Sequence, residues 1–486
     1  MNYSHCSTEP ERPQQRHTHV CLCGSTPVAL SAWHWRHGGV CRSRAPSPVL
    51  ADLVPPGHSQ PDTRPAVLNA GRSLHEIFNM AKNTSHHAAA ALTPPVTRVL
   101  MKLLPLTMAV FIAFLTLGMQ LPVLPLYLHD SLGMGTLVVG LVIGSEFAAA
   151  LLTRAWAGNF ADMRGPKKAV VAGTVAAASS GLAYLVSLAF ADAPEVAVWI
   201  LLAGRILLAF GQSLIVTGSM GWGIGLVGPQ NAGKVMAWNG IAIYAAYAFG
   251  APLGVAVSAQ WGFHGIAVSA VFIPLLALGI VAGVKGVAPA AQRRTPFYKV
   301  LGAVWVPGTG LALSSVGFGL ITAFIALLFA ARGWDNASAA FTAFGVAFIA
   351  ARLLFGHLPD RIGGAKVALV SVIIEAVGQL LIWGSDAAAG AWLGAALTGF
   401  GYSLAFPGFG VEALRRAPPQ TRSLAMGAYA AFLDLALGLT SPLAGALAGA
   451  WGIGSVYLAG AVTVGLSVFV AWRLLVTEPA RTAVHA

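Results

Sequence analysis

Four ionisable residues stand inside long apolar stretches of the chain: Glu146, Arg205, Glu375 and Asp434. A charge in the hydrocarbon of a bilayer is costly, so such a residue usually faces a partner or a water-filled cavity. A carboxylate can take up and release a proton, whereas an arginine keeps its charge and binds anions. The set therefore predicts proton transfer or ion binding within a membrane.

Glu146 and Arg205 are placed to meet. Glu146 lies about ten residues into one apolar stretch and Arg205 about eight into another, so both would lie roughly 12–15 Å below the same surface. Protonation of Glu146 would then free Arg205 for an anionic substrate or a new partner. The alternative is a static buried ion pair. Gln212, seven residues after Arg205, shares its helix face and supports a polar cavity wall.

Asp434 stands near the middle of its stretch, eight residues before Pro442, and Tyr244 holds the matching position before Pro252. A lone acid at that depth is either a proton carrier or the acceptor of an interhelical hydrogen bond. Glu375 is either a packing residue or part of the transport pathway.

Helices must hold these residues. From Leu104 onward, apolar stretches of about 20 residues follow one another, the length that a helix needs to cross a bilayer. We predict an all-α membrane protein with twelve transmembrane helices, approximately at 104–128, 136–157, 167–190, 197–221, 235–258, 263–284, 302–330, 338–356, 367–385, 390–413, 423–447 and 454–476.

The chain also repeats itself. Five residues recur 198 positions later: Arg154, Gly158, Asp162, Gly165 and Lys168 return as Arg352, Gly356, Asp360, Gly363 and Lys366. A second set recurs 190 positions later: Pro229-Gln230, Pro252 and Trp261-Gly262 return as Pro419-Gln420, Pro442 and Trp451-Gly452. Six spans in each copy make the two halves parallel repeats. We therefore expect six-helix bundles at 98–284 and 301–477, a cytoplasmic linker at 285–300 and a cytoplasmic tail at 478–486.

Composition agrees with a lipid environment. Apolar residues make up 56% of the chain, charged residues 9%, and the mean hydropathy is +0.72. Loops after even-numbered spans, with the central linker, hold thirteen Lys and Arg residues, whereas loops after odd-numbered spans hold Arg332 alone. This bias places both termini in the cytoplasm. It also accounts for most of the net charge of +12, so nucleic acid binding is not expected.

Residues 1–97 differ in kind, with no sustained apolar period, and we expect disorder or an over-translated extension before Met80. His17, His19, Cys21 and Cys23 alternate at a spacing that matches no standard zinc pattern, so no metal site is predicted. No nucleotide-binding motif and no cofactor is implied. Neither H-E-x-x-H nor G-x-S-x-G occurs after residue 100, which argues against an enzyme.

Three motifs resemble one family. GNFADMRGPKK at 158–168, with its partial repeat GHLPDRIGGAK, resembles the loop signature of the major facilitator superfamily. LLAGRILLAFGQS, which contains Arg205 and Gly211, resembles its fourth-helix motif. GAPLG at 250–254 resembles the helix-5 motif of its antiporters, with Ala251 where a glycine is usual. The chain also resembles the YhhS/YfcJ-like transporters of bacterial inner membranes.

The resemblance implies alternating access around a central site. It implies a cytoplasmic latch that stabilises an outward-open state, formed by Arg154, Gly158, Asp162, Gly165, Lys168, Arg352, Gly356 and Asp360, although the second loop could serve only to fix topology. It implies a hinge in helices 5 and 11 at Gly250, Pro252, Gly254 and Pro442.

Proton coupling or substrate binding would fall to Asp434, Glu146, Arg205 and Gln212. The expected function is export of a small organic solute by proton antiport at the bacterial inner membrane. Proton-coupled uptake of a sugar or organic acid, or an uncoupled facilitator, is the alternative. We expect a monomer whose partners are the solute, protons and the lipid bilayer.

Overall fold

The computed structural model describes residues 96–288, 298–417 and 422–477, and the regular elements in these ranges are helices joined by short turns. The predictions for residues 1–95, most of the linker and the tail lie outside them. The helices are α2 (Val96–Leu126), α3 (Thr136–Arg164), α4 (Pro166–Leu188), α5 (Pro194–Val227), α6 (Ala232–Ala282), α7 (Tyr298–Ala331), α8 (Ala337–Phe355), α9 (Leu358–Ile362), α10 (Gly364–Trp383), α11 (Ala388–Arg416), α12 (Arg422–Trp451) and α13 (Ser455–Val476), with the short turns η1 (Tyr127–Ser131) and η2 (Pro229–Asn231).

The long segment α6 holds two spans. It has 51 residues, and Gly262, with φ of 59° and ψ of −159°, divides it. After this glycine the chain returns along α2. Phe263 stacks on Tyr127 with ring centroids 4.0 Å apart, and Val281 shares an apolar cluster with Leu106 near the other end of α2. The two parts of α6 therefore correspond to the fifth and sixth predicted spans.

Ten helices in the described ranges are long and apolar enough to cross a membrane. That set counts α6 once and omits α11, a glycine-rich helix of 29 residues. Counting α6 as two spans and including α11 gives the twelve predicted helices in sequence order. The predicted fold class is confirmed.

The loop between the second and third spans is shorter than predicted. The sequence places a tight turn at 158–168, but α3 continues as helix to Arg164 and only Gly165, with φ of 95°, makes the turn. Gly158 lies within α3, where an added Cβ would meet nothing closer than Thr217 Cγ2 at 3.9 Å. In the second copy α8 ends earlier, at Phe355, and the five-residue helix α9 follows.

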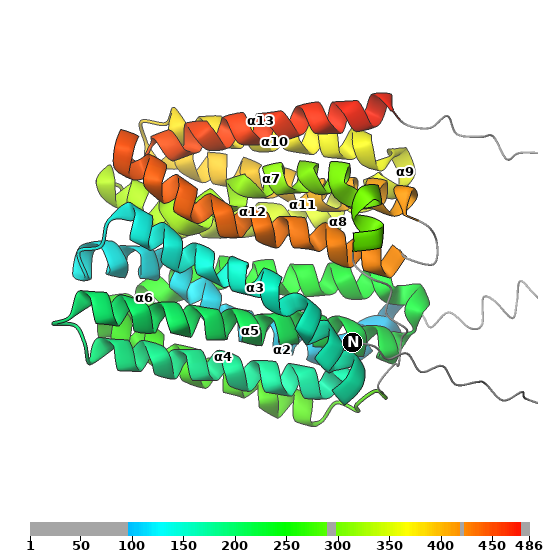
Figure 1. Cartoon of the computed structure of the whole chain (residues 1–486), viewed down its shortest axis with the longest axis horizontal. Coiled ribbons are helices and arrows are strands. Elements are labelled where there is room, and N and C mark those ends of the chain that lie inside the picture. The colour runs from blue at the N-terminus through cyan, green and yellow to red at the C-terminus, as the bar shows by residue number, and fades with distance from the viewer. Residues whose placement is uncertain (1–95, 289–297, 418–421, 478–486) are drawn as a thin grey trace, which may run out of the picture. The chain divides into compact units, whose positions relative to one another are not determined.

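Two pairs of helices join the six-span halves. α3 packs along α12 (Figure 1). The first part of α6 packs along α8, where Gly345 lies against Tyr244 and Ala248. We call the end where α2 begins and α13 ends the terminal end, and the other the opposite end. The α3–α12 contact extends from Thr136, whose hydroxyl donates to Gly445 O at 2.8 Å at the opposite end, to Arg154 toward the terminal end.

Small residues allow these contacts. A Cβ added to Gly140 would lie 3.0 Å from Pro442 Cα, and one added to Gly144 would lie 2.9 Å from Pro442 Cδ. Pro442 thus rests on the backbone of α3. Gly250 has a different role, because its close neighbours are backbone atoms of Gly118 in α2, within its own half.

Candidate functional site

Glu146 of α3 and Arg205 of α5 form the buried ion pair that their depths suggested. Their residues are 1% and 2% exposed, respectively. Arg205 Nη1 also donates to Gln120 Oε1 of α2 at 3.1 Å. Gln212 lies beside the Glu146 carboxylate, although its Nε2 makes no regular hydrogen bond to the described residues. Three helices of the first half therefore meet at one buried polar centre.

A small cavity adjoins this centre, with room for about one water molecule. Thr322 of α7 contributes to its wall, so the cavity lies between the two halves. Its lining residues are Gln120, Leu121, Leu124, Pro125, Ile143, Arg205 and Thr322. Arg205 is therefore the charged group of the first half that adjoins a space shared with the second.

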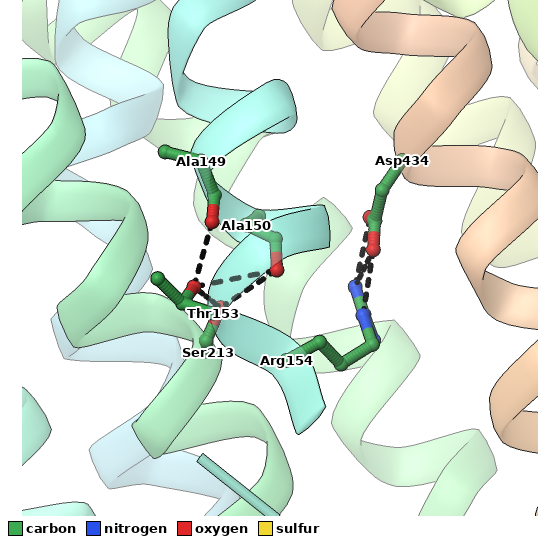
Figure 2. A network of polar contacts seen from close by, with 6 residues as sticks. All are labelled: Ala149, Ala150, Thr153, Arg154, Ser213 and Asp434. Atoms are coloured by element: carbon green, nitrogen blue, oxygen red, sulfur yellow. Dashed lines mark hydrogen bonds and ion pairs between the residues drawn. The ribbon is translucent and has the colours of Figure 1, made fainter. Parts of the chain in front are cut away.

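Asp434 is not the lone acid that the sequence suggested. Arg154 donates from Nε to Asp434 Oδ2 at 2.6 Å and from Nη2 to Oδ1 at 2.8 Å (Figure 2). These two charge-assisted hydrogen bonds join α3 of the first half to α12 of the second half. The Asp434 side chain is 6% exposed, whereas that of Arg154 is 33% exposed. Solvent therefore reaches the pair from the arginine side.

The residue before Arg154 is bound to its own half. Thr153 Oγ1 lies 3.0 Å from Ser213 Oγ of α5, and Thr153 also donates to Ala149 O at 2.8 Å. Figure 2 shows Thr153 and Arg154 extending from α3 toward different neighbours. α3 is thus attached to α5 and to α12 at consecutive residues.

Arg352, the repeat counterpart of Arg154, has different surroundings. Its guanidinium carbon lies 5.5 Å from the centroid of the Phe348 ring, and its Nε has no hydrogen-bond partner among the residues that the structure describes. Phe348 stacks in turn on Tyr244 of α6, with centroids 3.7 Å apart. The sequence grouped Arg352 with the loop, but the structure places it beside an aromatic cluster between the halves.

The loop residues lie at the terminal end. Asp162, Lys168 and Asp360 are exposed. Lys167 donates from Nζ to Ala282 O at 3.0 Å and to Val284 O at 2.8 Å. It therefore binds the carbonyls at the end of α6, where a cation stabilises a helix.

Glu375 of α10 is fully buried and lies within the second half. Neither of its carboxylate oxygens has a hydrogen-bond partner among the described residues. Gln379, one turn later, donates to Thr398 Oγ1 of α11 at 3.1 Å. Glu375 does not join the two ion pairs described above.

The sequence did not single out two residues that the structure shows in polar contacts. Gln120 is one of several polar residues in the apolar stretches, and only its contact with Arg205 distinguishes it. Glu412, near the end of α11, accepts a bond from Ala365 N at 3.2 Å and pairs with Arg416 at 2.8 Å. The sequence E-x-x-R-R at a helix end was a detectable signal for the second group, because side chains three and four positions apart are neighbours on a helix.

Comparison with known proteins gives a consistent picture. The family model described as Major Facilitator Superfamily matches residues 106–335 and 308–486. An uncharacterized MFS-type transporter of Salmonella typhimurium is 45% identical over 367 residues, which cover 76% of this chain and 95% of the relative. The uncharacterized MFS-type transporter YhhS of Escherichia coli K12 is 40% identical over 382 residues, 79% of this chain and 94% of that protein. The crystal structure of a D-xylose-proton symporter superposes with a TM-score of 0.63 at 15% identity, covering 76% of this chain and 97% of that one.

Proposed function

Because the chain belongs to the major facilitator superfamily, we propose that it exports a small organic solute across the bacterial inner membrane in exchange for protons. Secondary transport of a solute by a multi-pass membrane protein follows from the family and the fold. The direction, the coupling ion and the membrane are our proposal. The Arg154–Asp434 pair between the halves is the observation that carries it.

We assign the terminal end to the cytoplasm. Lysines and arginines concentrate there, as the positive-inside rule requires. The described examples are Arg164, Lys167, Lys168, Lys234, Lys285, Arg361, Lys366, Arg415 and Arg416, whereas Arg332 lies at the opposite end.

On this assignment the halves are in contact on the periplasmic side. Thr136 is bonded to Gly445, and Thr342 of α8 donates to Ala248 O of α6 at 2.9 Å. Arg154–Asp434 joins α3 to α12 closer to the cytoplasm than Thr136–Gly445 does. The described conformation would therefore be the one that faces inward, with Arg154 reached from the cytoplasm.

The Arg154–Asp434 pair gives a route to coupling. Separation of α3 from α12 would break both hydrogen bonds and expose Asp434 to the periplasm, where its carboxylate could bind a proton. A protonated carboxyl carries no charge and does not bind Arg154 as an ion pair. α3 and α12 could then come together again with the proton still bound to Asp434. Release of the proton to the cytoplasm would restore the ion pair. One proton would then enter for each solute that leaves.

Glu146 and Arg205 supply a second, fully buried pair in the first half. We propose that the solute or a proton perturbs this pair through the cavity that Arg205 lines. The loop residues Asp162, Gly165, Lys168 and Asp360 would stabilise the outward-open state, as the family resemblance implies. Pro442 lies at the α3–α12 pair, which must separate, and Gly250 and Gly254 pack on α2 within the first half. We propose that these residues, with Pro252, let α6 and α12 bend during the change of state.

Proteoliposomes containing the full chain and an internal pH-sensitive dye test the proposal. Sugars, organic acids and cationic drugs are added in turn to wild type and to Asp434→Asn and Glu146→Gln. Asp192→Asn is the matched control, because Asp192 is exposed in the turn before α5. We expect protons to move in the direction opposite to the solute in wild type, and we expect Asp434→Asn to abolish this proton flux. Parallel fluxes would establish symport, and solute movement without protons in every variant would establish a facilitator.

A further inference from the structure

The two repeats differ at one matched pair of positions. Arg154 and Arg352 correspond at the offset of 198, and Tyr244 and Asp434 correspond at the offset of 190. The helix pairs that carry them also correspond, since α3 packs on α12 and α6 packs on α8. In one interface the arginine meets a carboxylate, whereas in the other the carboxylate position is occupied by Tyr244.

Arg352 consequently lacks a counter-charge. Arg154 and Arg205 each bind a carboxylate, whereas Arg352 lies in the last turn of α8 beside aromatic rings. Arg352 forms no ion pair within the described ranges, and the ionisable groups around it are the hydroxyls of Tyr244, Tyr402 and Tyr429. A partly buried cation without an anionic partner is costly.

Flat apolar surface surrounds this charge. Phe348 contacts both the Arg352 guanidinium and the Tyr244 ring, and further rings continue the cluster. Phe318 stacks on Tyr402 with centroids 5.5 Å apart and on Phe344 with centroids 5.4 Å apart. The rings come from α6, α7, α8 and α11, and so from both halves. Tyr244 and Arg352 are the partly exposed members, so they mark the edge that a solute could reach.

We infer that Arg352, with Tyr244 and Phe348, binds the anionic group of the transported solute, and that this solute is an organic carboxylate with a ring or other apolar body. Its carboxylate takes at Arg352 the place that Asp434 takes at Arg154, and its body packs on the aromatic rings. The guanidinium repels a cation at this position. This inference rests on the proposed function, because it names the solute class of the same transporter.

Binding to the purified full chain in detergent tests the inference without transport. The probes are ring compounds matched in shape and different in charge: benzoate, benzamide and benzylamine, and the cyclohexane analogues of all three. Thermal unfolding at increasing probe concentration gives a dissociation constant, since a ligand of the native state raises the unfolding temperature. We expect at least one carboxylate to stabilise wild type, and its amide and amine to leave the unfolding temperature unchanged.

Arg352→Gln should weaken carboxylate binding at least tenfold, and Arg352→Lys should weaken it less, because lysine keeps the charge but loses the bidentate geometry. Arg361→Gln is the matched control, since Arg361 is exposed at the terminal end. Should Arg352→Gln fail to fold, two comparisons still test the inference. One is the dissociation constant of the carboxylate for wild type against Arg352→Lys, and the other is the binding of carboxylate, amide and amine probes to wild type. Stabilisation by an amine, unchanged affinity in the Arg352 variants, or no effect of any carboxylate would overturn the inference.

The two proposals fail separately. Proton-coupled transport of a neutral or cationic solute would retain the proposed function and overturn the carboxylate site. Carboxylate binding that depends on Arg352, in a chain that moves no protons, would retain the site and overturn the coupling.

Discussion

Arg154 and Asp434 lie 280 positions apart in the chain, yet they form a two-bond ion pair between α3 and α12. The pair connects the two halves at a place that solvent reaches through Arg154. Disruption of this single contact should therefore change how often the halves separate.

Asp434→Asn and Arg154→Gln should each favour separation of α3 from α12, and the double variant should have little further effect. Because Arg154 is a third exposed, solvent screens the pair, and its contribution should be about 1 kcal/mol, or roughly a fivefold change in population. Ser441→Cys reports the change, since Ser441 is fully buried beside Gly140.

The measurement is the rate of labelling of Ser441→Cys by a thiol reagent, with the four native cysteines, all within the first 41 residues, replaced by serine. Asp192→Asn should leave the rate at the wild-type value. Additive effects of the two single substitutions would show that the residues act independently.

Glu146→Gln should destabilise the protein more than Arg205→Gln. Glutamate left without Arg205 can become neutral by binding a proton, whereas arginine left without Glu146 cannot lose its charge. Breaking a buried pair costs about 3–5 kcal/mol when the remaining charge is uncompensated. Thermal unfolding in detergent at neutral pH checks the order of the two variants, and the reverse order would mean that Gln120 or water compensates Arg205 fully.

Gly144→Ala should separate α3 from α12 at a cost of about 1–3 kcal/mol, because the new Cβ would lie 2.9 Å from Pro442 Cδ and from Gly438 O. We expect slower transport and faster labelling of Ser441→Cys. Gly279→Ala is the matched control, since nothing lies within 4 Å of its added Cβ, and alanine there should stabilise the helix by about 0.5–1 kcal/mol. Equal effects of the two substitutions would contradict the close packing of α3 on Pro442.

Gly165→Ala and Gly158→Ala should differ, although both glycines belong to the repeated loop motif. Gly165 has φ of 95°, where an alanine is strained by about 1–2 kcal/mol, whereas Gly158 is helical with open space at its Cβ position. The unfolding temperature of each variant measures the difference. A strong loss at Gly158 alone would require a contact that only another conformation makes.

The spans could be predicted because a transmembrane helix depends on residues that are close together in the sequence: an apolar stretch, and the glycine or proline that ends it. The buried pair Glu146–Arg205 was predictable for a similar reason: the depth of each residue follows from its position in a span. Asp434 was different, since its partner depends on which helices of the two halves face each other. Tyr244 was identified only as the counterpart of Asp434, and the aromatic rings around it are spread over four helices with no shared sequence motif.

The consecutive bonds of Thr153 to α5 and of Arg154 to α12 have a mechanical consequence. Neighbouring residues on a helix point about 100° apart, so α3 is fastened on two sides at one level. A displacement of α3 at Arg154 also displaces Thr153, the adjacent residue, and Thr153 contacts Ser213 of α5. α5 is the helix that carries Arg205. Sliding of α3 alone is resisted, so α3 and α5 should move together, and the contact that a proton can weaken at this level is the one to Asp434 in the other half.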